Sequence, residues 1–332
     1  HRGIVGLVNG VLRNIQRKGT LDVSLINETN KRISIQYSLP LWLVEEFIEQ
    51  LGIEETEQLA RTFSDKPKLS IRVNTKKISR ENAIEEGFEV LKSAISPFGL
   101  VIEKGVPVSS PLFKEGYISI QDESSMLVAP ALNVKPSHQV LDACAAPGGK
   151  TMHIATSFLD ASKGGTVIAL DIHAHKIELI ESNAKRLGVQ EIVTAKQLDA
   201  RDAYLEYGEE VFDRVLVDAP CSGLGLIRRR PEIRYNKTKE DIISLQKLQL
   251  EILESASKTL KKGGELVYST CTITQSENQE VVNQFLEKNK DFTRIEIDVS
   301  DSSLKVSADG SLTIYPHDYG TDGFYICRLK KQ

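Results

Sequence analysis

From residue 139 to the end of the chain, short apolar runs alternate with segments in which apolar residues recur every three or four positions. The apolar runs predict strands at residues 139–145, 165–173, 192–200, 212–220, 265–272 and 323–331. The periodic segments predict helices at residues 148–159, 174–188, 239–264 and 276–289. Apolar strands that alternate with amphipathic helices are typical of a parallel, doubly wound α/β sheet covered on both faces.

The chain before residue 139 has a different rhythm. A helix is predicted over residues 38–52, with Pro40 near its start and Gly52 near its end. A strand at 69–75, a helix at 79–86 and strand-like stretches up to residue 121 then indicate a small α/β unit. Residues 3–19 predict a helix with a broad apolar face, and such a face requires a partner.

Composition sets broad limits. Of the 332 residues, 40% are hydrophobic and 27% charged, which fits a globular protein with a sizeable core. No apolar run approaches the length of about 18 residues that spans a membrane. The four cysteines include no C-x-x-C pair, which argues against a zinc site or a disulfide framework and favours a reducing, cytoplasmic location. Because the sequence opens with HRGIVG and no Met, we expect it to be part of a longer protein.

The net charge of −4 gives no sign of nucleic-acid binding, but two local clusters do. Arg228, Arg229 and Arg230 form one cluster. The other cluster lies between Asp65 and Arg80 and consists of Lys66, Lys68, Arg72, Lys76, Lys77 and Arg80. Each cluster by itself is as consistent with a solvated face as with a binding surface.

The loop LDACAAPGGKT, residues 141–151, follows the first of these strands and ends like a phosphate-binding P-loop. The first glycine of that motif is replaced by Cys144, whose Cβ obstructs the turn around a phosphate. The dinucleotide fingerprint G-x-G-x-x-G is also absent. What remains is a run of small residues that lets the backbone approach a flat ligand.

Acidic residues end the first three of these strands. Asp142, Asp171 and Asp199 therefore share the carboxyl edge of the sheet, where such folds bind ligands. Asp171 is placed to accept hydrogen bonds from ribose hydroxyls, and Asp199 is placed near an adenine amino group. Each acid could instead cap the helix that follows it. Together the three predict an adenosine site.

Three cysteines lie just beyond predicted strands: Cys144, Cys221 and Cys271. The fourth and fifth strands of a doubly wound sheet are usually adjacent, so Cys221 and Cys271 are expected to face one another beside Asp218. For Cys144 and Cys327 the favoured interpretation is inert packing.

An adenosine cofactor, two thiols and a carboxylate suit methylation at carbon 5 of cytosine. That carbon is too electron-poor to attack a methyl donor until a thiolate adds to carbon 6. A carboxylate near N3 would promote the addition, and a second thiol could assist release of the product.

The segments LDACAAPGGKT, FDRVLVDAPCSG and LVYSTCTITQSENQEVV closely resemble the RNA (cytosine-5)-methyltransferases that use S-adenosylmethionine. The resemblance covers essentially the whole chain and is closest to the bacterial Fmu/Sun type, which modifies 16S rRNA. It implies a Rossmann-like class I methyltransferase sheet. The opening GLVNGVLRNI resembles the end of the NusB-like RNA-binding domain of that type, most of which is absent.

The resemblance also implies site residues. Cys271 would be the nucleophile, Cys221 would assist product release, and Asp218 would contact the target cytosine. Arg72 and Asn74 match an upstream motif and are expected to face RNA. The residues implied to line S-adenosylmethionine are Ala143, Cys144, Ala145, Ala146, Pro147, Gly148, Gly149, Lys150, Asp171, Lys176, Asp199 and Asp218.

The resulting hypothesis divides the chain into a NusB-like remnant (1–35), a small RNA-binding domain (36–125) and a catalytic domain (126–332). It predicts a cytoplasmic monomer without metal that methylates 16S rRNA. The alternatives are methylation of another RNA such as tRNA, and a non-catalytic RNA-binding module, which would have no use for both thiols. A nucleotide hydrolase and a nicotinamide-dependent dehydrogenase do not fit the loop.

Overall fold

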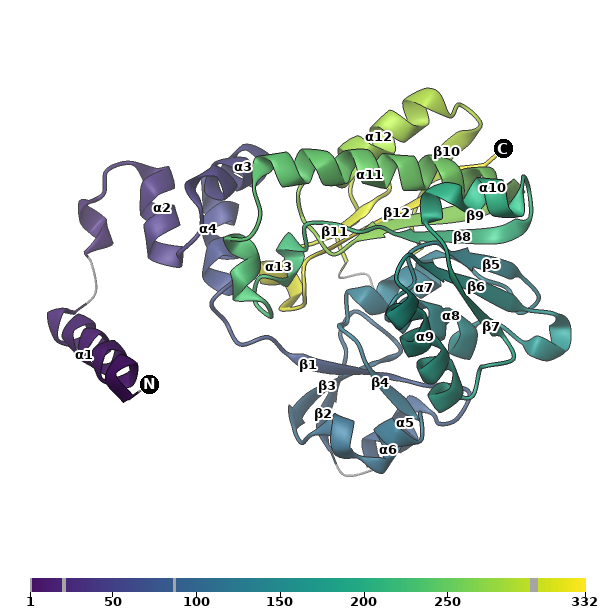
Figure 1. Ribbon diagram of the computed structural model, residues 1–332, viewed down its shortest axis with the longest axis horizontal. Helices are drawn as coiled ribbons and strands as arrows, with labels where there is room; N and C mark the ends of the chain where they lie inside the picture. The colour runs from purple at the N-terminus through teal and green to yellow at the C-terminus, as the bar shows by residue number, and fades with distance from the viewer. Residues whose placement is uncertain (1, 20–21, 86–87, 299–303) are drawn as a thin grey trace. The chain divides into compact units, whose positions relative to one another are not determined.

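The computed structural model describes residues 2–19, 22–85, 88–298 and 304–332 (Figure 1). By its internal contacts the chain divides into two compact units, residues 1–60 and 61–332. Within the described ranges, no helix combines the length and apolar character that crossing a membrane requires.

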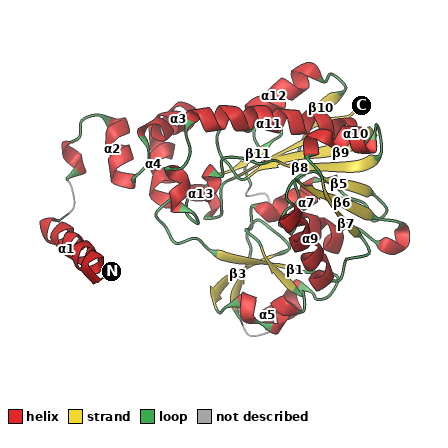
Figure 2. Cartoon of the chain, in the orientation of Figure 1, coloured by secondary structure: helices red, strands yellow, loops and turns green. Residues whose placement is uncertain are grey.

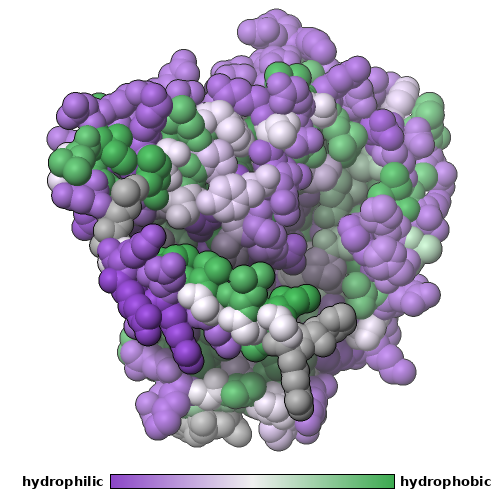
Figure 3. All heavy atoms as spheres, turned by 60° about the vertical axis from the view of Figure 1, so that its left-hand side comes forward, coloured by the Kyte–Doolittle hydropathy of each residue, from purple (hydrophilic) through white to green (hydrophobic). Residues whose placement is uncertain are grey.

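The first unit is helical, as its sequence predicts. α3 begins after Pro40 and ends at Gly52, whose positive φ of 80° suits glycine. The apolar side chains of α1 are exposed, for example Leu7 at 69% and Ile15 at 59%. Figure 3 brings this side forward and shows hydrophobic side chains open on the surface. The helices are α1 (Arg2–Lys18), α2 (Thr29–Tyr37), α3 (Leu41–Leu51) and α4 (Ile53–Thr62).

The second unit begins with a small antiparallel sheet in the order β2-β3-β1-β4. Its core includes Ile71, Leu100 and Ile118. The predicted helix over 79–86 is α5, although residue 86 lies outside the described residues. The elements are β1 (Leu69–Val73), α5 (Arg80–Glu85), β2 (Glu89–Lys92), β3 (Gly99–Lys104), α6 (Pro111–Lys114) and β4 (Ile118–Ile120).

A larger sheet follows, in the order β10-β12-β9-β8-β5-β6-β7, with β11 paired to β12. β5 to β9 are parallel, as predicted. β12 runs antiparallel to β9 on one side and to β10 on the other, so the predicted parallel pairing does not hold for this last strand. The strands are β5 (Gln139–Asp142), β6 (Thr166–Asp171), β7 (Val193–Gln197), β8 (Phe212–Asp218), β9 (Leu260–Thr270), β10 (Phe292–Ile295), β11 (Leu312–Ile314) and β12 (Phe324–Lys331).

Helices cover both faces of this sheet (Figure 2). Successive strand residues point to opposite faces, so Val140 packs in one core with Ile154 of α8, and Leu141 packs in another with Ile252 of α11. These two cores confirm the doubly wound arrangement. The helices are α7 (Val128–Ala131), α8 (Gly149–Ser157), α9 (Ala174–Leu187), α10 (Ala203–Tyr207), α11 (Lys239–Lys258), α12 (Gln279–Lys288) and α13 (Pro316–Tyr319).

Short 3-10 helices occupy several connections: Val23–Leu25, Pro107–Ser109, Ser125–Leu127, Ala161–Lys163, Ala200–Asp202, Leu224–Leu226 and Pro231–Arg234. The pairing of β8 with β9 matters most for the site. Their parallel register places Asp218 beside Ser269. The loops that leave these two strands therefore start side by side at the carboxyl edge of the sheet.

Candidate active site

Two thiols meet at the carboxyl ends of β8 and β9. Cys221 lies three residues beyond Asp218, and Cys271 directly follows β9. Their sulfur atoms are 3.2 Å apart, within hydrogen-bond distance. The predicted juxtaposition of the two cysteines is confirmed, because adjacent parallel strands deliver both loops to the same place.

The two thiols have opposite tendencies to ionise. A hydrogen bond from Cys221 lowers the pKa of Cys271, and the nearby Lys150 ammonium lowers it further, against the opposing effects of burial and Asp218. The same hydrogen bond, together with burial, raises the pKa of Cys221 well above its ordinary value. Cys271 is therefore the thiol of the pair that ionises more readily, and a thiolate is the nucleophilic form.

Asp218 ends β8 beside these thiols and accepts two hydrogen bonds. Lys150 Nζ donates to its Oδ2 at 2.6 Å, and Ser269 Oγ donates to its Oδ1 at 2.8 Å. Burial is the largest single effect and would lower the pKa of Lys150, but the charge and hydrogen bond of Asp218, together with the charges of Cys271 and Asp142, raise it. The pair therefore holds an ammonium and a carboxylate next to Cys271, where either can hold or deliver a proton.

A first cavity of about 450 Å³ opens at this edge of the sheet. Asp171 lies on it at the end of β6 and is 3.5 Å from the ammonium of Lys176. Asp199 lies on it beyond β7, where the bound Arg201 guanidinium lowers the pKa of its carboxyl. The predicted cofactor residues on its wall are Ala143, Cys144, Ala146, Asp171, Lys176, Asp199 and Asp218.

Several lining residues of the first cavity were missed by sequence reasoning. Leu248 and Ile252 come from α11, whose apolar spacing reads equally well as packing against the sheet. Others lie within two positions of a strand-end acid in the sequence: Ile172, His173, Leu198 and Arg201. Their closeness in sequence to Asp171 and Asp199 was the signal that could have indicated that these four residues line the cavity.

Asp142 does not join the other two strand-end acids, so its predicted place in the adenosine site is wrong. It is fully buried and accepts a hydrogen bond from Thr151 Oγ1 at 2.6 Å. Burial raises the pKa of its carboxyl to about 7. Asp142 therefore fixes the start of α8 and does not line the first cavity.

A second cavity of about 480 Å³ adjoins the first. Ala146, Asp218 and Cys271 line both, so the two cavities meet at the candidate nucleophile. Four residues predicted to line the cofactor lie on this second cavity instead: Ala145, Pro147, Gly149 and Lys150. Gly148 lines a third, smaller cavity.

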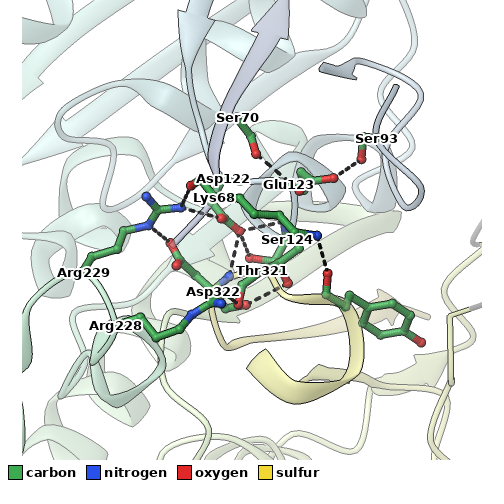
Figure 4. A network of polar contacts seen from close by, with 11 residues as sticks. Lys68, Ser70, Ser93, Asp122, Glu123, Ser124, Arg228, Arg229, Thr321 and Asp322 are labelled. Atoms are coloured by element: carbon green, nitrogen blue, oxygen red, sulfur yellow. Dashed lines mark hydrogen bonds and ion pairs between the residues drawn. The ribbon is translucent and has the colours of Figure 1, made fainter. Parts of the chain in front are cut away.

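One wall of the second cavity is an ionic network (Figure 4). The Arg229 side chain donates to Asp322 at 2.6 Å and to Asp122 at 2.8 Å, and the Asp322 amide donates to Asp122 at 3.1 Å. Burial and then the charge of Asp122 raise the pKa of Asp322 to about 6, against the effect of Arg229. Arg228 beside it is buried and donates to the Thr321 carbonyl. Two members of this arginine cluster are therefore structural.

Arg72 and Asn74 were predicted to face RNA. This stays a prediction for Arg72, which lines the third cavity, and it is wrong for Asn74. Both are buried, at 1% and 2% exposure. Asn74 donates to the carbonyls of Gly116 and Leu187, which joins the small sheet to α9. Neither side chain lies on the outer surface, because each satisfies backbone carbonyls within the second unit.

A buried carboxylate that sequence reasoning missed ties the two cysteine loops together. Glu277 is fully buried and accepts from the Ser222 amide at 2.8 Å, from Ser222 Oγ at 2.5 Å and from Thr274 Oγ1 at 3.0 Å. Gln249 of α11 donates to it at 3.1 Å. The position of Cys221 next to Cys271 depends on this shared acceptor.

Cys327 is fully buried in the core, as predicted for packing, and burial raises its pKa to about 11. Cys144 is only partly buried as a residue, so packing alone does not describe it, and burial of its thiol raises its pKa. Cys144 also lines the first cavity. In the described part of the chain, no three His, Cys, Asp or Glu side chains gather closely enough to hold a metal ion.

The chain resembles known proteins along its whole length. Residues 129–330 match the family described as 16S rRNA methyltransferase RsmB/F, and residues 39–109 match the ferredoxin-like domain of RsmF/B-like methyltransferases. Probable ribosomal RNA small subunit methyltransferase B of Bacillus subtilis is 43% identical, over 100% of this chain and 75% of the relative. Ribosomal RNA small subunit methyltransferase B of Erwinia tasmaniensis is 34% identical, over 98% of this chain and 73% of the relative.

Solved structures share the fold. NSun6 from Pyrococcus horikoshii with SFG has a TM-score of 0.75 and 26% identity, over 86% of this chain and 97% of the other. The family match covers most of the catalytic sheet, including every strand that carries a site residue. From these matches and this site we conclude that the chain belongs to the RsmB/F family of 16S rRNA methyltransferases.

Proposed function

We propose that this chain methylates carbon 5 of a cytosine in 16S rRNA through a covalent bond between Cys271 and carbon 6 of the base. The observation that carries the proposal is the meeting of the two cavities at Cys271 and Asp218. A methyl donor in the first cavity and a base in the second would then share one reaction centre.

The first cavity fits S-adenosylmethionine, which would supply an electrophilic methyl group. The carboxylate of Asp171 suits ribose hydroxyls, and Asp199 suits an adenine amino group. The apolar side chains of Ile172, Leu198 and Ile252 suit the faces of a flat ring. The relative solved with SFG, an analogue of this cofactor, supports the assignment.

The reaction begins with Cys271. Its thiolate forms a bond to carbon 6, the double bond between carbons 5 and 6 opens, and carbon 5 becomes nucleophilic. Asp218 and Lys150 face the polar edge of the base, where a proton held at N3 stabilises the charge that the addition creates. Bound S-adenosylmethionine would supply the methyl group to carbon 5, with its methyl–sulfur bond breaking and the neutral thioether leaving.

Release of the product requires transfer of the carbon 5 proton to a base, re-formation of the double bond from that electron pair, and cleavage of the bond between carbon 6 and Cys271, which leaves as a thiolate. Cys221 donates a hydrogen bond to Cys271 at 3.2 Å, so it stabilises the departing thiolate. The same hydrogen bond favours the attacking thiolate, and the role proposed for Cys221 in addition is to assist release after methyl transfer.

A covalent-trapping gel tests both roles. Cys221→Ala, mixed with S-adenosylmethionine and a 16S rRNA transcript, is expected to accumulate a denaturant-resistant protein–RNA band. The band should disappear when Cys271→Ala is added, and Cys327→Ala, which changes a buried cysteine of β12, should behave like the unmodified chain. Bisulfite mapping that finds no new 5-methylcytosine in rRNA treated with the active enzyme would contradict the proposal.

A further inference from the structure

A third cavity, of about 170 Å³, lies directly beside the second. The two share Ile120, Pro147 and Gly149 on their walls. Its volume is below the roughly 300–1,000 Å³ of a pocket that takes a whole small molecule, so a single chemical group is the better fit. The residues that distinguish it are two arginines, Arg72 of β1 and Arg186 of α9.

Both guanidinium groups are held only by neutral acceptors. Arg72 donates to Gln121 Oε1 at 2.5 Å and to the Gly149 carbonyl at 2.7 Å. Arg186 donates to the carbonyls of Phe113 and Ile118, at 2.8 Å and 3.1 Å. Across the residues that the structure describes, no Asp or Glu forms an ion pair with either arginine. Two positive charges therefore share this cavity without a negative counterpart.

The charge of Arg72 is the more costly of the two. Its side chain is 1% exposed, and its Nε has no hydrogen-bond partner. Burial, and then the charge of Arg186, lower the pKa of Arg72 to about 9. A buried cation without an anionic partner is strongly unfavourable, so a bound anion would stabilise this arrangement.

The start of α8 adds to the positive potential. Gly148 precedes the helix as its N-terminal cap and Gly149 is its first residue, and both line the third cavity. Backbone amides at a helix N-terminus carry partial positive charge and bind phosphate readily. Guanidinium groups bind phosphate with paired hydrogen bonds.

We propose that Arg72, Arg186 and the start of α8 bind a backbone phosphate of the substrate RNA, next to the nucleotide whose base occupies the second cavity. The shared wall of the two cavities is what points to RNA as the source of the phosphate. This inference rests on RNA being the substrate and not on which atom of the base is methylated.

The first test is the salt dependence of RNA binding, with the full chain and a 16S rRNA transcript. Arg186→Gln is expected to weaken binding roughly tenfold and to reduce the slope of log affinity against log salt by about 0.7 to 0.9, the value of one phosphate contact. Arg186→Lys should keep the slope. Arg294→Gln is the matched control, because it removes an arginine from β10 at the far edge of the sheet.

A second test uses the unmodified chain, so it does not depend on a variant folding. Single uncharged methylphosphonate linkages are placed on either side of the nucleotide that mass spectrometry of the treated RNA identifies as methylated. One of them should weaken binding to the unmodified chain and have no further effect on Arg186→Gln. Equal binding of both modified RNAs would overturn the proposal. So would a loss of S-adenosylmethionine affinity in Arg186→Gln with RNA binding intact, which would assign the site to the cofactor carboxylate.

Discussion

At the scale of single residues, the pKa values of the two site thiols, Cys221 and Cys271, are shifted in opposite directions. Cys221 donates a hydrogen bond that stabilises a thiolate at Cys271, and Lys150 stabilises the same charge from the other side of Asp218. Neither residue type nor position in the sequence reveals this asymmetry. It depends on which sulfur lies nearer the ammonium.

The asymmetry predicts how Cys271 titrates. Removing the donor in Cys221→Ala should raise the Cys271 pKa, because the thiolate loses a charge-assisted hydrogen bond. The pH midpoint of iodoacetamide alkylation at Cys271, followed by peptide mass spectrometry, measures this. Lys150→Met should raise the midpoint as well, and Cys327→Ala should leave it unchanged. A midpoint in the unmodified chain above that of free cysteine would contradict the assignment.

At the scale of elements, the position of the strand ends at the carboxyl edge of the sheet was predictable. The buried side chain of Glu277, which holds the loops at that edge together, was not. The apolar runs located the strand ends, and therefore Asp171, Asp199 and the two cysteines, because strands of a doubly wound sheet present these ends together. Glu277 gave no such signal, since a polar residue before a helix usually reads as exposed. The division of the chain at residues 35 and 125 stays a prediction.

Glu277 joins three elements, which predicts a large cost for its removal. Glu277→Ala should lower the free energy of unfolding by roughly 2–4 kcal/mol, because several buried donors lose their acceptor. Urea unfolding measures this. Glu277→Gln, which keeps one acceptor oxygen, should cost less. Glu280→Ala on the exposed side of α12 should stay within about 0.5 kcal/mol. An equal effect of the two alanine variants would refute the role of Glu277.

At the scale of the whole second unit, the ionic network in Figure 4 connects three segments that are far apart in sequence. Asp122 follows β4 of the small sheet, Arg229 belongs to the connection after β8, and Asp322 precedes β12. The second cavity is lined by all three. Its shape therefore depends on contacts that no local sequence pattern encodes.

This network predicts a pH-dependent variant. Arg229→Met leaves Asp322 beside Asp122 without the guanidinium, which should raise the pKa of Asp322 above its present value of about 6. A carboxyl whose pKa is higher in the folded than in the unfolded protein lowers the stability of the folded state at a pH above that pKa. As the pH falls through the pKa the carboxyl is protonated, and this loss of stability disappears. The variant should therefore lose roughly 1–2 kcal/mol at pH 8 and less at pH 5.

Urea unfolding at the two pH values checks this expectation. Arg230→Met, at the adjacent position on the same cavity, is the control and should show no such pH dependence. A deficit for Arg229→Met that is equal at pH 5 and pH 8 would argue against coupling between the two carboxylates.

The sequence by itself determined the doubly wound sheet, the shared edge of its strands and the chemical groups at that edge. Strand periodicity and the adjacency of successive parallel strands suffice for this, because both are local or follow from general rules of connection. The same reasoning failed for Asp142, since a strand-end acid can point into the core as readily as into a cleft.

Only the tertiary structure decided the burial of Arg72, the meeting of two cavities at Cys271 and the acceptor role of Glu277. Each depends on distances between segments that are 28 to 107 positions apart along the chain, as in the Gln249–Glu277 and Arg229–Asp122 contacts. Such distances follow from how sheets, loops and helices pack together. The sequence therefore determined which chemical groups the site contains, and tertiary packing determined the distances between them.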